Sequence, residues 1–220
     1  MAIKLEVWGD YALFTRPEMK VERVSYDVMT PSAARGILEA VYWHPGMRWV
    51  IDSIQVCNPI RFVNIRRNEV KATISARTVK SVMEKNKGTL YMDTSNEIQQ
   101  RSSLLLRNVR YVIEAHFEMT EKASSGDNPG KFQDIIKRRI KKGQFYHQPY
   151  MGCREFPAYF KEAEENTSYD SELNGEKDLG FMLYDLDYSD DNNVKPMFFR
   201  AVMRDGKIDV PDIQSEEVIM

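Results

Sequence analysis

The stretch TPSAARGILEAV, residues 30–41, predicts a helix around which neighbouring strands can be placed. Thr30 suits the N-cap position because its side-chain oxygen accepts a backbone N–H of the first turn, and Pro31 suits the first helical position, where no N–H is required. The apolar residues that follow recur at helical spacing, at Ala33, Ala34, Ile37, Leu38 and Val41. The helix should end before Pro45-Gly46, because this pair marks a turn.

Strand patterns lie on both sides of this helix. In residues 3–8, Ile, Leu and Val alternate with Lys, Glu and Trp, which predicts a first strand. Strand-like residues follow the helix from 49 to 63. The segment 103–119 also reads as strand, and we interpret it as two strands that turn at Asn108. The order so far is therefore strand, helix, strand, followed by a pair of strands.

The second half of the chain repeats this alternation. Residues 130–142 predict an amphipathic helix, with Gly143 as its C′ residue, and 152–159 is a further strand candidate. Residues 162–178 are acidic and read as a linker or excursion. Strands are then expected at 180–188, 197–203 and 207–210, the last two joined at the hairpin turn Asp205-Gly206.

Residues 64–100 are polar and basic, with weak strand patterning at 72–79. We interpret them as a long hairpin or mobile loop whose tip lies near Asn86-Lys87-Gly88. A hairpin inserted between β-α-β and α-β gives the split pattern of a ferredoxin-like unit. We therefore predict an α+β protein: an RRM-like, ferredoxin-like domain over 1–160 with an inserted β-hairpin, and a small acidic C-terminal antiparallel β-sheet domain over 161–220.

The charge of the chain is divided between these two parts. Residues 1–160 hold 25 Lys/Arg against 17 Asp/Glu, a balance of +8, whereas residues 161–220 hold 6 against 16, a balance of −10. The net charge of −2 therefore conceals a basic body with an acidic C-terminal part. Basic clusters on a folded body are typical of proteins that bind polyanions.

Several classes of protein are disfavoured by composition. No apolar run is long enough to span a membrane, the N-terminus lacks the features of a secretory signal, and the two cysteines provide no disulfide framework. We expect a cytoplasmic protein without membrane contact. The three histidines, His44, His116 and His147, lack metal-ligand spacing, so we expect no metal site and no cofactor.

Two basic clusters are the strongest candidates for binding RNA. One comprises Arg61, Arg66, Arg67, Lys71, Arg77 and Lys80; the other comprises Lys131, Lys137, Arg138, Arg139, Lys141, Lys142 and Arg154. A solvated face is the alternative for either cluster, but two clusters, on a hairpin and on a helix, favour phosphate binding. Tyr146 lies among them and could stack on an unpaired base. Duplex DNA remains an alternative polyanion.

Among the histidines, His147 is the first candidate for proton transfer. It lies in a loop between Gly143 and Gly152, flanked by cations, and imidazole titrates near neutral pH. His44, beside Tyr42, is a second candidate. His116 lies between Glu114 and Glu118 on a polar strand face, which indicates a structural or solvated role.

Several motifs together resemble one known family. They are WGDYALFT at 8–15, VYWHP at 41–45, AHF at 115–117, GCREF at 152–156 and RAVM at 200–203, the last followed by Gly206. In this combination the chain resembles the Cas-five d-type proteins of subtype I-C CRISPR systems, from the first strand to about residue 210. The resemblance implies a ferredoxin-like core of the RAMP superfamily with a small C-terminal β-sheet.

The resemblance also implies an activity and its residues. It implies a metal-independent endoribonuclease that cuts the CRISPR repeat hairpin, leaves a 2′,3′-cyclic phosphate and a 5′-OH, and remains with other subunits in the type I-C surveillance complex. Tyr42 matches the family's catalytic Tyr, and Lys131 matches the Lys of its Lys-His pair. Phe132 stands where the His is expected. Either activity is weakened, or another imidazole enters the site, for which His147 is our choice. A non-catalytic subunit that caps the 5′ handle of the guide is the alternative.

Overall fold

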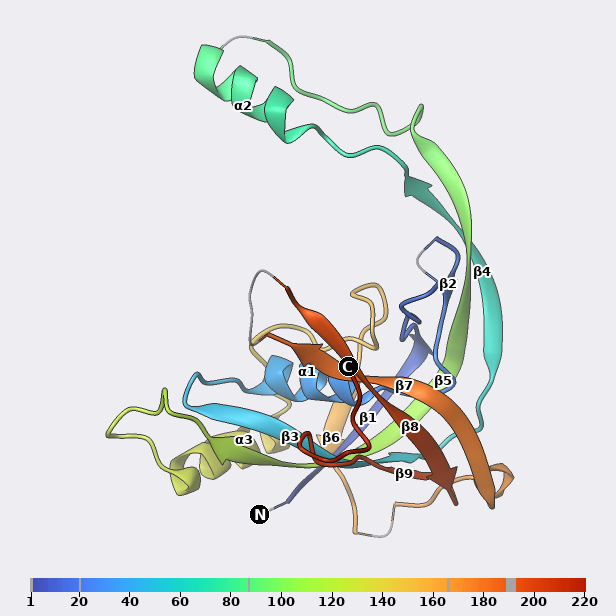
Figure 1. The fold of residues 1–220 in the computed structure, drawn as a ribbon, viewed down its shortest axis with the longest axis vertical. Coiled ribbons are helices and arrows are strands. Elements are labelled where there is room, and N and C mark those ends of the chain that lie inside the picture. Colours follow the sequence, from blue (N-terminus) through green and yellow to red (C-terminus); the bar gives the residue numbers. More distant parts are fainter. Residues whose placement is uncertain (1, 20, 87, 166, 189–192) are drawn as a thin grey trace.

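A computed structural model describes residues 2–19, 21–86, 88–165, 167–188 and 193–220 of the chain. Its helices are α1 (Pro31–Val41), α2 (Ala76–Lys85), α3 (Pro129–Lys142) and the short 3-10 helix η1 (Ser171–Leu173). Its strands are β1 (Ile3–Ala12), β2 (Arg23–Val24), β3 (Met47–Val56), β4 (Phe62–Val70), β5 (Ile98–Met119), β6 (Tyr159–Glu162), β7 (Glu176–Asp187), β8 (Lys195–Arg204) and β9 (Lys207–Asp209). The protein is therefore a mixed α and β fold dominated by strands (Figure 1).

The two predicted amphipathic helices are confirmed, with Thr30 and Gly143 in the predicted capping positions; α3 begins one residue earlier than predicted, after an Asn128 N-cap. The Thr30 hydroxyl accepts the N–H of Ala33 at 3.3 Å, and Pro31 begins α1. At α3 the side chain of Asn128 accepts the N–H of Lys131 at 2.9 Å, and Gly143 closes the helix with a φ of +61°. A positive φ is a conformation that glycine adopts without strain, which explains the end of α3 at this residue.

All nine strands of the described residues belong to one sheet, and all of its pairings except that of β2 with β5 are antiparallel. Its strand order is β6-β1-β5-β3-β9-β8-β7, with β2 and β4 also paired to β5. Leu5, Ile54 and Ile113 are fully buried on the face that α1 and α3 cover. The opposite face of β1 and β5 carries mainly polar and charged side chains, and most of them are partly exposed although Glu6 is buried. The sheet thus buries one face and leaves the other to solvent.

The inserted hairpin is longer and more regular than the sequence indicates. β5 is a single strand, so the predicted turn at Asn108 is wrong: β5 continues its pairing with β1 on both sides of this residue, whose φ is +50°. Asparagine tolerates this left-handed conformation, so the strand is perturbed locally without reversing. β4 pairs with β5 along its whole length, and the two curve away from the body (Figure 1).

The end of this hairpin is helical. The weak strand pattern at 72–79 was misleading, because Ser75 caps α2, which begins at Ala76 and has no buried residue. Asn86 ends α2 in the left-handed conformation, so the chain does reverse near the predicted tip, although Lys87 lies outside the described residues. We call β4, α2 and the paired part of β5 (98–106) the arm.

Two other strand predictions need correction. The strand-like stretch 49–63 is divided between β3 and β4. The strand expected at 152–159 is mostly a turn, and β6 begins only at Tyr159. Gly152 has a φ of +81°, and a Cβ placed on it would lie 2.1 Å from the backbone oxygen of Leu13. This close approach of two backbones requires glycine and bends the chain away from an extended course.

The C-terminal strands pair as predicted but extend the main sheet. β7 and β8 are antiparallel, and Asp205-Gly206, both with positive φ, form the expected turn into β9. β9 also pairs with residues 53–55 of β3, which continues the sheet into the C-terminal part. The domain division at residue 160 stays a prediction. No helix among the described residues has the length and apolar character needed to cross a membrane.

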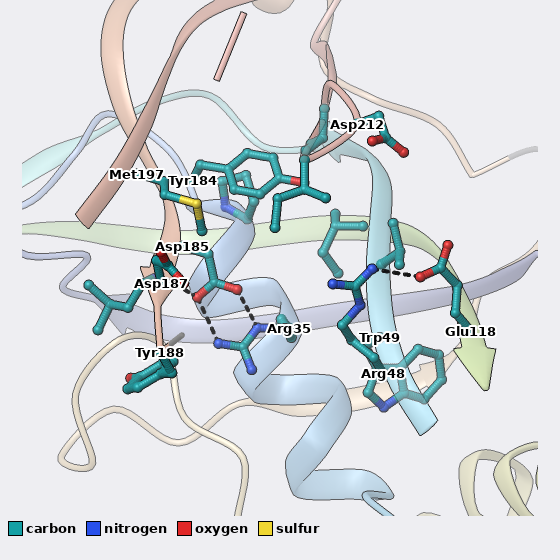
Figure 2. A pocket seen from close by; sticks show the side chains of 16 residues that line it. Arg35, Arg48, Trp49, Glu118, Tyr184, Asp185, Asp187, Tyr188, Met197 and Asp212 are labelled. Carbon is teal, nitrogen blue, oxygen red and sulfur yellow. Dashed lines mark hydrogen bonds and ion pairs between the residues drawn. The ribbon is translucent and has the colours of Figure 1, made fainter. Parts of the chain in front are cut away.

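A partly open cavity of about 300 Å³ marks the junction between α1 and the C-terminal strands (Figure 2). The Arg35 guanidinium of α1 makes two hydrogen bonds of 2.7 Å to Asp185 of β7 and one of 2.6 Å to Glu39. Although burial acts to lower it, the hydrogen bonds and charges of these carboxylates raise the pKa of Arg35. The bidentate pair therefore ties β7 to α1.

We expect Asp185→Ala to lower the free energy of unfolding by about 2 kcal/mol, because it leaves a largely covered guanidinium with one partner fewer. Urea denaturation measures the change. The matched control is Glu176→Ala, which removes an ion pair with Arg204 whose side chains are 64% and 66% exposed. That variant should stay within about 0.5 kcal/mol of the parent. Equal losses in the two variants would contradict a special role for the Arg35–Asp185 pair.

Candidate active site and nucleic-acid interface

The side chains of the predicted catalytic region gather around Phe132. Tyr42, the C-cap residue of α1, lies with its ring centroid 6.1 Å from that of Phe132. The His44 ring lies 4.9 Å from the same ring, and Phe117 of β5 packs on it at 6.2 Å. Phe132 is fully buried. The position at which the resemblance predicts a histidine therefore holds a buried aromatic ring in this chain, with the imidazole of His44 beside it.

Lys131 lies next to this centre and is held by a carboxylate. Its Nζ is 2.9 Å from Asp127 Oδ1. The other carboxylate oxygen of Asp127 accepts the backbone N–H and the hydroxyl of Ser124, at 2.9 and 2.7 Å. Hydrogen bonds from Ser124, and then from Lys131, lower the pKa of Asp127, so it is a carboxylate at neutral pH. Asp127 thus positions the ammonium group of Lys131. Asp127 was not identified as a candidate residue from the sequence.

Tyr42 is embedded among cations. The Arg139 Cζ lies 5.2 Å from the centre of the Tyr42 ring, and its Nη1 donates to the Val41 carbonyl at 2.6 Å. Burial is the main cause of a raised pKa for Tyr42; Arg139 and Lys131 oppose the rise and Asp127 adds to it. The phenol therefore keeps its proton at neutral pH and can donate a hydrogen bond.

The two candidate histidines differ in their surroundings. His44 Nδ1 accepts the N–H of Gly46 at 3.0 Å and lies 3.9 Å from Asp127 Oδ2. A backbone N–H on Nδ1 places the proton of the neutral ring on Nε2. His147 is exposed, and within the described part of the chain its one ring contact is with Tyr146, at 6.0 Å. The loop does return to α1, because the Tyr146 N–H donates to Ala40 O at 2.8 Å.

The cations of α3 divide into two groups. Lys137, Arg138, Lys141 and Lys142 are exposed and free to face a polyanion, as is Arg154 in the later turn. Arg139 is instead engaged with Val41 and Tyr42. Tyr146, in the loop after α3, is 85% exposed, so its ring is available for stacking. A basic surface with an open aromatic ring therefore adjoins the Tyr42 and Lys131 region.

The cations of the arm lie elsewhere. Figure 1 shows α2 and α3 at opposite ends of the longest axis, so Arg77 of α2 is remote from Lys131. Arg66, Lys71 and Arg77 are exposed along β4 and α2. The Arg61 guanidinium pairs with Glu172 at 2.9 Å, and that of Arg67 with Glu155 at 2.8 Å. The cations of α2 and α3 thus form separate surfaces, whereas Arg154 lies in the chain next to Glu155, the partner of Arg67 of β4. The carboxylates of Glu172 and Glu155 compete with phosphate for Arg61 and Arg67.

Two further properties of the region concern ligands. Within the described residues, no group of three or more His, Cys, Asp or Glu side chains could hold a metal ion. The cavity at the C-terminal junction is lined by none of Tyr42, His44, Lys131 or His147. The candidate site is consequently the surface around Phe132.

Comparisons with known proteins agree in one family. The family model Cas_Cas5d, described as "CRISPR-associated protein (Cas_Cas5)", matches residues 2–211. The chain is 52% identical over 221 residues to the CRISPR pre-crRNA endoribonuclease Cas5d of Mannheimia succiniciproducens, with 98% of this chain and 97% of the relative covered. It is 38% identical over 233 residues to the protein of the same name from Thermus thermophilus, with 98% and 94% covered.

A solved structure described as "Crystal Structure of CRISPR-associated Protein" has a TM-score of 0.70 and 25% identity to this chain, with 100% of this chain and 97% of the other covered. The fold and the sequence therefore both lead to CRISPR-associated proteins. On the match over residues 2–211 and the two near-full-length relatives, the chain belongs to the Cas5d family of CRISPR-associated proteins.

Proposed function

We propose that this chain is an endoribonuclease that cuts precursor CRISPR RNA at its repeat hairpin. The observation that carries the proposal is that Tyr42 and His44 pack on Phe132, while Asp127 lies 3.9 Å from His44 Nδ1 and holds Lys131 of α3, the helix that carries the exposed cations. The names of the two relatives, both pre-crRNA endoribonucleases, support the same substrate. A hairpin stem is bound largely through its phosphates and 2′-hydroxyls, which suits exposed lysines and arginines.

The proposed reaction uses the RNA's own hydroxyl and no metal. The ribose 2′-oxygen attacks the adjacent phosphorus, its proton leaves, and the bond from phosphorus to the 5′-oxygen breaks. The products are a 2′,3′-cyclic phosphate and a 5′-OH, which receives a proton. Lys131 stabilises the charge that develops on the phosphate, and Tyr42 donates a hydrogen bond to a phosphate oxygen or orients the 2′-OH. A histidine handles the proton.

His147 remains the prediction from sequence for this histidine, and the contact of His44 with Phe132 supports His44 for the same role. We further infer a ferredoxin-like RAMP core made of β1, α1, β3, β5, α3 and β6. Its strand order, β6-β1-β5-β3, supports this inference. As a cytoplasmic subunit of the type I-C surveillance complex, the protein would keep hold of its product.

Cleavage of the cognate repeat RNA in excess EDTA tests the proposal. The wild-type chain should cut the all-ribose RNA and leave intact an RNA with a single 2′-deoxy substitution at the scissile nucleotide, because the nucleophile is then missing. End analysis of the products should show a cyclic phosphate. Strict dependence on added metal, or cleavage of the 2′-deoxy RNA, would contradict the proposed chemistry.

The alternative is a non-catalytic subunit that caps the 5′ handle of the guide, and the replacement of histidine by Phe132 favours it. A binder would hold the ribose and 2′-deoxy RNAs equally and cut neither. The remaining possibility is a protein that binds duplex DNA. Both nucleic acids carry phosphates, so competition between repeat RNA and duplex DNA at fixed salt shows which of the two the protein prefers.

A further inference from the structure

The uncovered face of the sheet carries a row of aromatic and basic side chains. On this face Tyr159 of β6 lies opposite Trp8 of β1, which lies opposite Arg110 of β5. The rings of Trp8 and Tyr159 are stacked, with centroids 6.2 Å apart and planes 27° apart. Tyr159 is nevertheless 53% exposed. Two aromatic rings side by side on an open sheet, with ring surface left in solvent, form a platform on which a planar ligand can continue the stack.

The charged side chains next to this platform pair with one another. The Arg110 Nε donates to Glu6 Oε1 at 2.7 Å, and Lys161 Nζ lies 3.4 Å from Glu6 Oε2. Glu164 approaches Lys161 at 3.5 Å. Two cations are therefore matched by two carboxylates, so stacking rather than net charge distinguishes this surface. A base is the planar ligand that such a platform selects with little regard to sequence.

The platform adjoins the surface assigned to RNA. β6 is the edge strand of the sheet, and its residues point alternately to the two faces. Phe160 packs on the helix side against Phe145, at 6.4 Å, in the loop that also carries Tyr146. Tyr159 points to the open side. RNA held at the end of α3 therefore has to pass over only one β-strand, β6, to reach Tyr159.

We propose that an unpaired nucleotide of the RNA flanking the hairpin stacks on Tyr159 and extends the Trp8–Tyr159 pair on the open face of the sheet. This inference rests on the proposed function, because it needs the hairpin to be bound on the other side of β6. It gives the protein a subsite for single-stranded RNA that is separate from Tyr42, His44 and Lys131. The platform grips a base without reading its sequence.

The test compares the binding of two RNAs to the wild-type protein and to variants at Tyr159. The probes are the cognate repeat hairpin alone and the same hairpin with eight unpaired adenosines at each end, both fluorescently labelled. Wild-type protein should bind the extended RNA roughly tenfold more tightly than the hairpin alone. Tyr159→Leu should bind both RNAs about equally, whereas Tyr159→Phe, which keeps the ring, should retain the advantage. Phe181→Leu, at an aromatic residue 57% exposed on β7, is the matched control and should also retain it.

The outcomes separate this inference from the proposed function. If wild-type protein neither binds nor cuts the hairpin, the proposed function fails and the inference fails with it. If wild-type protein binds and cuts the hairpin but Tyr159→Leu keeps the full advantage of the extended RNA, the inference alone is overturned. Ultraviolet cross-linking of 4-thiouridine placed in the unpaired flanks gives a readout without substitution. Cross-links should map to Trp8 or Tyr159, and their absence from both would also overturn the inference.

Discussion

Replacing Lys131 with alanine is expected to slow cleavage of repeat RNA by about 100- to 1000-fold under single-turnover conditions. The ammonium group of Lys131 is held by Asp127 at 2.9 Å, so it meets the phosphate already oriented. Stabilising charge that develops only in the transition state lowers the barrier, whereas a contact made equally by bound RNA lowers only the dissociation constant. The affinity for uncut RNA should therefore change much less than the rate.

Two controls separate this effect from a loss of positive charge or of folding. Lys122→Ala removes the same charge from the exposed loop before α3 and should leave the rate unchanged. Lys131→Arg keeps the charge but alters the geometry, and should recover only part of the rate. Denaturing gels give the rates, and filter binding of the 2′-deoxy RNA gives the affinities. A Lys131→Ala protein that cuts at the wild-type rate would remove Lys131 from the reaction.

Tyr42 should contribute through its hydroxyl, and the pH dependence follows from the direction of its shift. Its pKa is raised by burial, so the phenol stays protonated below the ordinary tyrosine range and loses its proton only above it. Tyr42→Phe should therefore lower the rate by a factor that stays constant between pH 7 and 9. A factor that grows with pH over this range would indicate a phenolate acting as a base instead.

Local sequence signals predicted the helices whose ends are marked by capping residues close in the chain. Thr30-Pro31 and Gly143 bound helices through contacts made within a few residues, so α1 and the end of α3 follow from the sequence. Asn108 misled because the same left-handed φ serves a turn or an irregularity inside a strand, and only the continued pairing with β1 decides between them. Gly152 misled because its constraint is the distant backbone of Leu13.

The candidate site was predicted where a residue matched the family motif and missed where a partner lay elsewhere in the chain. Tyr42 and Lys131 were both named from sequence. Asp127 was not, because a carboxylate four residues before a lysine gives no signal until α3 and the preceding turn bring the two together. The sequence also could not show that the arm lies far from α3, since both clusters look alike as lists of cations.

The most informative pair of variants is His44→Ala and His147→Ala. We expect the first to slow cleavage by about 100-fold and the second by no more than about threefold. His44 packs on Phe132 with its Nδ1 already bonded to Gly46, so Nε2 is the nitrogen that can donate to the RNA. His147 contacts Tyr146 and would serve mainly to hold RNA. His116→Ala, at an imidazole paired with Asp52 on the open face of the sheet, is the matched control.

The chemical role of His44 can be tested independently of the size of the loss. If Nε2 donates to the departing 5′-oxygen, an RNA in which that bridging oxygen is sulfur should be cut by His44→Ala nearly as fast as by wild type, because a thiolate leaves without a proton. The same RNA should not rescue Lys131→Ala, whose defect lies at the phosphate. Rescue of His147→Ala instead, with His44→Ala fully active on ordinary RNA, would move the proton transfer to the loop after α3 and restore the interpretation made from sequence.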